Sequence, residues 1–339
     1  MRKKWIDDES FPRKIMAQIY DFCRPMNRRP YLMDNMHPAV QLFFLIMLCF
    51  VFFSALYFFS MYLVRPLFGI TWMDEVMQNA VSKPEMVAMN ANQVNALKFL
   101  QFTQTLGLFL IPALLFAKLK FPEGDYLRLN AKTNFLFVLL GILILVTASP
   151  IIDFTYYLNQ RLEFPSFLSR LEKAVNDAEH ANAQFTFLFI KTPRPTDLWI
   201  NLIVIALVPA ISEEVFFRGC LQQVFKEWTK NIHWAVWLGG AVFSFAHFEF
   251  YGFVPRMLLG ALLGYLFVWS GSLWMPIIVH AFNNGAQIVL SYLHEHGKIQ
   301  YDIASNQMES VWVTIIATVI CIGLLWLYRK MMMERRFIY

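Results

Sequence analysis

Long apolar runs with few or no charged residues constrain this chain more than any other feature. Each run can cross the hydrocarbon core of a bilayer, which is about 30 Å thick. Hydrophobic residues make up 58% of the 339 residues and charged residues only 16%, whereas about a quarter of an ordinary soluble domain is charged. The sequence therefore predicts an all-α, polytopic bundle of transmembrane helices.

About eight spans are expected, in a single transmembrane helical domain of residues 38–330. A polar and basic segment, residues 1–37, precedes it and is expected in the cytoplasm. A tight turn between the fifth and sixth spans is expected at Gly252, Pro255 and Arg256, which interrupt the apolar run. The expected spans are 39–64, 98–117, 134–152, 198–220, 236–255, 256–270, 273–293 and 311–328.

The distribution of Lys and Arg predicts the orientation of a multi-pass protein. Basic residues concentrate before the first span, after the second, at the end of the fourth and in the tail. With eight spans these regions share one side, so both termini are expected in the cytoplasm. The net charge of +5 is modest and lies at helix ends and in short loops, so the expected partner is the lipid bilayer and no nucleic acid.

Residues 154–196 are then expected on the outer side. Phe167, Leu168, Leu171 and Val175 follow helical spacing between charged residues, which is typical of an amphipathic helix. Two interpretations stay open for this stretch. It lies on the outer membrane surface, or it forms a small cap over the bundle.

Ionisable residues inside a span are costly and are functional candidates by default. The fourth span contains Glu213, Glu214 and Arg218. Glu214 and Arg218 are four residues apart, so they share a helix face and can pair. Glu213 points about 100° away on the helix and has no partner within it. We therefore expect Glu214 to be structural, supported by Arg218, and Glu213 to be the carboxylate that is free to react.

Two further spans add polar residues. His247 lies in the expected fifth span, and His280 and Asn284 lie four residues apart on one face of the seventh. Glu213 and His280 are expected roughly 10 Å from the cytoplasmic ends of their spans, and His247 roughly 13 Å. A carboxylate, two imidazoles and an amide from three helices suffice to activate water and to stabilise an oxyanion.

These residues resemble the motifs of the CPBP intramembrane endopeptidases, the family of CAAX proteases and bacteriocin-processing proteins. The matching pieces are Glu213-Glu214-x-x-x-Arg218, Phe243-x-x-x-His247 and His280-x-x-x-Asn284, in that order. Gly271-Ser272-Leu273-Trp274 leads into the last piece in the same way. The resemblance covers about residues 197–290.

The resemblance implies an eight-helix bundle that hydrolyses a peptide bond near the C-terminus of a membrane-associated protein or peptide. Eukaryotic members act on prenylated proteins, so the resemblance is compatible with a lipidated or an unlipidated substrate here. It also implies that Glu213 activates water with help from His247, while His280 and Asn284 bind the oxyanion. Within this family, the resemblance relates the chain to the type II CAAX prenyl endopeptidases.

Metal dependence is left open by the sequence, although a metal-free glutamate mechanism is favoured and no cofactor is expected. Zinc, if present, would be held by Glu213, His247 and His280. No His-Glu-x-x-His helix is present, and no paired histidines flank Glu213. The sequence therefore favours a glutamic over a metallo-type endopeptidase.

Two other classes of function remain as alternatives to an endopeptidase. The first is a non-catalytic membrane scaffold or immunity-type protein on the same fold. The second is a transporter, which should show broken helices repeated in two halves, and the sequence shows none. Gly260 and Gly264 form a G-x-x-x-G pattern that is expected to allow close helix packing within the bundle rather than dimerisation.

Overall fold

A computed structural model gives the fold of residue 33 and of residues 35–70, 91–122, 124–162, 164–190, 194–300 and 310–335. Over these ranges the regular elements are all helices, which confirms the predicted helix bundle. Six helices are long and apolar enough to cross a membrane, so the chain is an integral, multi-pass membrane protein. They are Pro38–Phe68, Ala91–Lys120, Phe135–Asn159, Pro195–Thr229, Phe253–Ser270 and Val311–Glu334.

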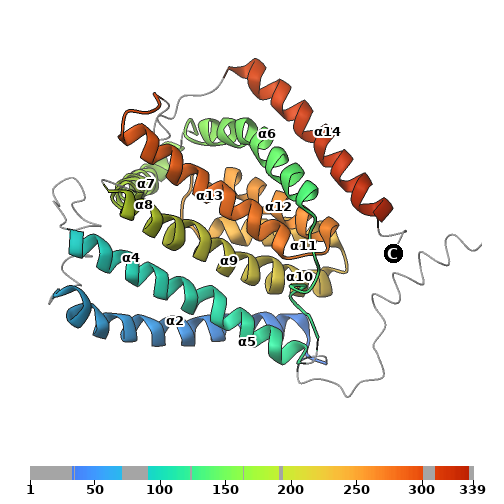
Figure 1. The fold of residues 1–339 in the computed structure, drawn as a ribbon, viewed down its shortest axis with the longest axis horizontal. Coiled ribbons are helices and arrows are strands. Elements are labelled where there is room, and N and C mark those ends of the chain that lie inside the picture. The colour runs from blue at the N-terminus through green and yellow to red at the C-terminus, as the bar shows by residue number, and fades with distance from the viewer. Residues whose placement is uncertain are drawn as a thin grey trace, which may run out of the picture.

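The helices pack side by side in a bundle (Figure 1). One edge is formed by two helices. The first is α2 (Pro38–Phe68), and the second is a continuous helix made of α4 (Ala91–Thr105), η2 (Leu106–Leu110) and α5 (Ile111–Lys120). The opposite edge is formed by α6 (Phe135–Asn159) and α14 (Val311–Arg335). Between these edges lies the core of the bundle, which contains α12 (Phe253–Ser270) and α13 (Trp274–Glu295).

The fourth helix runs through the centre of the bundle and alternates between α-helical and π-helical turns. Its segments are α8 (Pro195–Asn201), η4 (Leu202–Leu207), α9 (Val208–Glu214), η5 (Val215–Leu221) and α10 (Gln222–Thr229). The expected span ended at residue 220, but the helix continues through amphipathic α10. Glu213 is therefore 18 residues from Pro195 and 16 from Thr229, roughly 24–27 Å from either end. Its expected depth of roughly 10 Å from the cytoplasmic end of the span stays a prediction.

The helix that follows is shorter than the sequence predicted. α11 (Ile232–Phe245) ends ten residues before the expected limit, and α12 begins at Phe253. Pro255 and Arg256 lie inside the first turn of α12, where the missing N–H of a proline leaves no helix hydrogen bond unmade. The expected turn position at Pro255 and Arg256 is therefore wrong, and His247 lies in the connecting turn instead of inside a span.

The eight predicted spans each correspond to a helix, but two of these helices fall short of an obvious membrane span. α11 has 14 residues. α13 has 22 residues and carries polar side chains along its length, including His280, Asn283 and Asn284. The count of eight spans stays a prediction, whereas six candidate spans follow directly from length and composition.

Two glycines let α11 and α12 approach each other closely. A Cβ atom added to Gly260 would lie 2.8 Å from the Cα atom of Gly240, and one added to Gly240 would lie 2.9 Å from the carbonyl oxygen of Met257. A Cβ on Gly264 would lie 2.8 Å from Oε1 of Gln222. The expected role of the G-x-x-x-G pattern in packing within the bundle is therefore confirmed.

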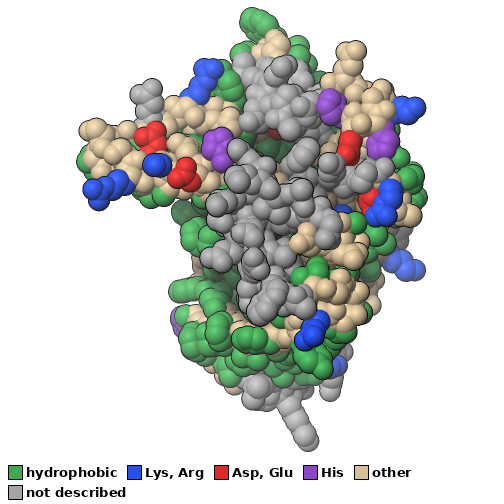
Figure 2. Space-filling model, turned by 90° about the vertical axis from the view of Figure 1, so that its left-hand side faces the viewer, with side chains coloured by type: hydrophobic (Ala, Val, Ile, Leu, Met, Phe, Trp, Pro, Cys, Tyr) green, Lys and Arg blue, Asp and Glu red, His purple; other side chains and the backbone are tan. Residues whose placement is uncertain are grey.

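The segment after α6 forms a short 3-10 turn, η3 (Ser166–Leu168), and the amphipathic helix α7 (Ser169–Ile190). α7 lies with α8 at one end of the bundle (Figure 1). Viewed from that end, charged and histidine side chains gather on the upper part of the molecule, and hydrophobic side chains are prominent at its lower left (Figure 2). The predicted amphipathic helix is present.

The orientation predicts which end of the bundle faces the outside. An impermeant thiol reagent applied to intact cells should label Asp177→Cys on α7 but should not label Glu334→Cys at the end of α14. Both variants are made in a background in which the native cysteines are replaced by alanine. The reason is the excess of Lys and Arg predicted on the cytoplasmic side. Labelling of Glu334→Cys alone would show that the orientation is inverted.

Candidate active site

The two adjacent glutamates of α9 have different surroundings, and Glu214 is the more constrained. Its side chain is fully buried, and its Oε1 atom lies 2.5 Å from Nη1 of Arg218. The pair that the four-residue spacing predicted is therefore present. Arg218 itself is 2% exposed, so both charges are removed from solvent and depend on each other.

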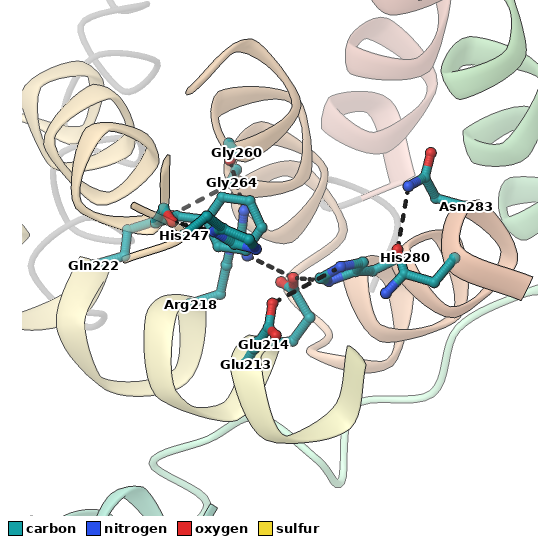
Figure 3. Close-up of polar contacts among 11 residues, drawn as sticks. Glu213, Glu214, Arg218, Gln222, His247, Gly260, Gly264, His280 and Asn283 are labelled. Atoms are coloured by element: carbon teal, nitrogen blue, oxygen red, sulfur yellow. Dashed lines mark hydrogen bonds and ion pairs between the residues drawn. The ribbon is translucent and has the colours of Figure 1, made fainter. Parts of the chain in front are cut away.

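Glu214 also contacts a residue that the sequence did not pair with it. Nδ1 of His280 lies 2.8 Å from the same Oε1 atom (Figure 3). An ionised carboxylate only accepts hydrogen bonds, so Nδ1 of His280 carries the proton of this bond. No described residue donates a hydrogen bond to the other oxygen, Oε2 of Glu214.

Glu213 faces the opposite side of the same imidazole. Its Oε2 atom lies 3.9 Å from Nε2 of His280, and this is its one charged contact among the described residues. His280 is therefore placed between two carboxylates, with Nδ1 bound to Glu214 and Nε2 directed toward Glu213. The prediction that Glu213 lacks a partner within its own helix agrees with this geometry.

Arg218 connects the fourth helix to α12. Its Nη2 atom donates to the carbonyl oxygen of Gly260 at 2.9 Å, and its guanidinium lies 4.8 Å from the centre of the Phe243 ring. One turn further, Nε2 of Gln222 lies 3.4 Å from the carbonyl oxygen of Gly264. A carboxylate, a carbonyl and an aromatic face thus compensate the buried charge of Arg218.

The local backbone around these residues is unusual. The π-helical segments η4 and η5 flank α9, which contains Pro209 and both glutamates. π-Helical turns inside α-helices are frequent at functional sites, and Pro209 cannot supply the N–H that a continuous α-helix requires. Helical spacing alone did not predict these turns.

His247 lies just beyond the end of α11, half-buried in the connecting turn. Its Nδ1 atom lies 2.8 Å from the carbonyl oxygen of Phe243, which is left without its usual helix partner where α11 ends. A carbonyl only accepts, so Nδ1 is the donor. In the neutral ring Nε2 therefore carries the lone pair, and this atom can accept a hydrogen bond from water.

Phe243 lies between the two imidazoles. Its ring centre is 4.9 Å from that of His247 and 5.8 Å from that of His280, in edge-to-face arrangements. Together with its contact to Arg218, this makes Phe243 the residue that touches three of the polar side chains of the site. Sequence reasoning assigned it no role, although its four-residue spacing from His247 was part of the motif.

Asn284 lies one helical turn after His280 on α13 and is half-buried. Its Oδ1 atom accepts a hydrogen bond from Nδ2 of Asn283 at 3.2 Å. That bond turns the amide so that Nδ2 of Asn284 is the atom left to donate. Direct contacts thus link four of the site residues, namely Glu213, Glu214, Arg218 and His280. His247 is linked to them through the ring of Phe243. Asn284 lies on the same helix as His280, one turn further along.

Nothing in this arrangement resembles a ready-made metal site. In the part of the chain that the structure describes, no three His, Cys, Asp or Glu side chains come together so that they could hold a metal ion. Glu213, His247 and His280, the alternative zinc ligands, therefore do not form such a group. Each histidine uses Nδ1 for a protein oxygen, which leaves Nε2 for another partner.

Residues 195–286 match the family model described as "Type II CAAX prenyl endopeptidase Rce1-like". The match contains every residue of the site described above and confirms the resemblance that the three motifs indicated. It covers the fourth helix, α11, α12 and the first half of α13.

Two curated relatives from Bacillus subtilis (strain 168) are similar to this chain. "Uncharacterized protein YyaK" is 29% identical over 155 residues, covering 39% of this chain and 50% of that protein. "Uncharacterized protein YpbD" is 29% identical over 84 residues, covering 24% of this chain and 40% of that protein. The chain thus spans half or less of the length of these relatives. No solved structure matches it.

The buried pair predicts a difference in stability between the two adjacent glutamates. Glu214→Ala leaves Arg218 buried without its carboxylate, a loss that typically costs about 3–5 kcal/mol. Glu213→Ala removes a side chain whose contact with His280 is 3.9 Å long. Thermal unfolding in detergent should therefore show a clearly lower midpoint for Glu214→Ala than for its neighbour Glu213→Ala. Equal midpoints would contradict the structural role of Glu214.

Proposed function

We propose that this membrane protein, which carries an Rce1-like region at residues 195–286, is an intramembrane endopeptidase that uses Glu213 to activate water. The observation that carries the proposal is the difference in contacts between the two adjacent carboxylates. Glu214 is occupied by Arg218 and His280, whereas Glu213 faces a single imidazole nitrogen at 3.9 Å. The match to an endopeptidase family supports the reaction class.

In this mechanism a water molecule lies between Glu213 and His247. Glu213 accepts one proton of the water as the general base, and Nε2 of His247 accepts a hydrogen bond from the other. The donation from Nδ1 of His247 to the Phe243 carbonyl keeps Nε2 in the accepting form. The oxygen lone pair of the water is then directed at the carbonyl carbon of the scissile peptide bond.

Attack forms a C–O bond and places negative charge on the former carbonyl oxygen. His280 and Asn284 stabilise this oxyanion, with Nε2 of a doubly protonated His280 and Nδ2 of Asn284 as donors. Glu214 holds Nδ1 of His280 and balances the charge of the imidazolium. The C–N bond then breaks as Glu213 returns its proton to the leaving nitrogen, so one water and one peptide bond yield a carboxylic acid and an amine, which ionise to a carboxylate and an ammonium group.

The substrate we propose is a membrane-associated protein or peptide, with or without a lipid anchor, that is cut near its C-terminus. The family description names prenyl endopeptidases, and Glu213 lies on the helix Pro195–Thr229, which is long and apolar enough to cross a bilayer. A lipid anchor would hold the substrate at the same membrane. The substrate therefore reaches the site from the bilayer or its surface rather than from bulk solvent.

Replacement of the base should separate catalysis from folding. Glu213→Gln keeps the shape of the side chain but cannot take a proton, so cleavage should fall by about 10²–10⁴-fold. The assay is mass spectrometry of products from a library of peptides with free C-termini, with and without lipid anchors, added to purified protein in liposomes. Glu334→Gln, an exposed carboxylate on α14, is the matched control. Cleavage by Glu213→Gln at the wild-type rate would refute this role, whereas no cleavage by the wild-type protein would favour a non-catalytic scaffold.

Metal removal tests the type of mechanism independently. Because no three His, Cys, Asp or Glu side chains among the described residues come together so that they could hold a metal ion, we expect activity to survive exhaustive chelation. Elemental analysis of the active protein should find no stoichiometric zinc. Zinc at one equivalent, with activity lost on its removal and restored on its return, would replace the glutamate mechanism by a metal-assisted one. The proposed endopeptidase activity would stand in that case.

A further inference from the structure

The turn that carries His247, residues 246–252, is the least regular backbone in the site. Phe248, the residue directly after His247, has a φ angle of +53°. Non-glycine residues rarely adopt this left-handed conformation because it costs energy. It persists only where contacts with the neighbouring structure offset that cost. The position of His247 therefore depends on what fixes this turn from outside.

Contacts within α11 and α12 fix the base of the turn. Oγ of Ser244 donates to the carbonyl oxygen of Phe253 at 2.6 Å and ties the end of α11 to the start of α12. Glu249 pairs with Nη2 of Arg256 at 2.5 Å. These contacts hold the two ends of the turn together, but they do not join the turn to any element other than α11 and α12.

Tyr251 supplies the contacts to other elements. It is 8% exposed, and its hydroxyl donates to Oδ1 of Asn176 at 2.8 Å. Its backbone N–H donates to Oε1 of Glu179 at 3.2 Å, and its carbonyl accepts from Nδ2 of Asn159 at 3.0 Å. One buried residue, four positions after His247, thus bonds the turn to the end of α6 and to two positions on α7.

α7 is oriented for this task. Asn176 and Glu179 are half-buried and lie almost one turn apart on the helix face that meets the turn, whereas Asp177, between them in sequence, is exposed. Two polar side chains of this amphipathic helix are therefore directed toward the turn. α6 and α7 both lie outside residues 195–286, which match the family model.

We propose that Tyr251 is a positioning residue for His247. It holds the turn against α6 and α7 so that Nε2 of His247 stays directed at the water that Glu213 activates. The inference rests on the proposed function. It adds that α7, which contributes no group to the reaction, sets the geometry of the reaction through Tyr251, Asn176 and Glu179.

Single substitutions test the contact. Tyr251→Phe and Asn176→Ala each remove the hydroxyl bond and should lower kcat about five- to tenfold with little change in KM. Asn176→Asp keeps an oxygen acceptor at the same place and should restore most of kcat. Asn182→Ala, on the same helix and also half-buried but without a hydrogen bond to Tyr251, should behave as wild type.

A double-mutant cycle shows whether Tyr251 acts through His247. In a His247→Ala background, adding Tyr251→Phe should cause no further loss of kcat, because the group that it positions is gone. A loss of the same size in both backgrounds, or an effect confined to KM, would overturn the proposal and favour a role of α7 in substrate entry.

Hydrogen exchange provides a measurement that does not depend on activity. Amides of residues 246–252 should exchange faster in Tyr251→Phe and Asn176→Ala than in wild type and Asn182→Ala. If the wild-type protein cleaves no peptide, the proposed function fails while exchange still tests the anchoring of the turn. If the wild type is active, and Tyr251→Phe shows wild-type kcat and wild-type exchange, only the role of Tyr251 fails.

Discussion

The buried ion pair of Glu214 and Arg218 is the interaction on which the rest of the site depends. Two charges in an apolar bundle are tolerated only when each is fully partnered. Arg218 therefore also binds the Gly260 carbonyl and the Phe243 ring, and Glu214 also binds His280. These partners belong to α12, α11 and α13, so satisfying one pair of charges fixes three other helices around the fourth.

That arrangement requires helices to approach closely, which the glycines of α11 and α12 allow. Gly240 and Gly260 bring the two backbones into contact, and the Gly260 carbonyl is then within reach of Arg218. With Arg218 held in this way, Glu214 is directed at Arg218 and His280. Glu213, about 100° around the helix, faces Nε2 of His280 instead. Fixing one carboxylate thus leaves its neighbour as the group that can exchange a proton.

The sequence predicted what depends on local spacing and missed what depends on the tertiary fold. Long apolar runs indicated the order of the helices, and four-residue spacing indicated the pair of Glu214 and Arg218. The contact between Glu214 and His280 joins residues 66 apart in sequence, so no helical period could predict it. The end of α11 was misplaced because residues 243–251 remain rich in aromatic side chains, and the glycine and proline signals come only afterwards. The π-helical turns have no comparable sequence signal.

Residues outside the Rce1-like region also build the site. The loop between α5 and α6 receives three hydrogen bonds from the start of α13. They run from Ser272 Oγ to the Ala131 carbonyl at 2.6 Å, from Trp274 Nε1 to Leu129 at 2.9 Å and from the Leu273 N–H to Arg128 at 3.3 Å. These bonds fix the position of α13 along its axis. His280 lies six residues after Trp274, which is fewer than two helical turns. The helix of the proposed oxyanion donors and the turn that carries His247 are thus both anchored by elements that precede residue 195. A fragment restricted to residues 195–286 would retain every proposed catalytic side chain and lose the contacts that hold two of them in place.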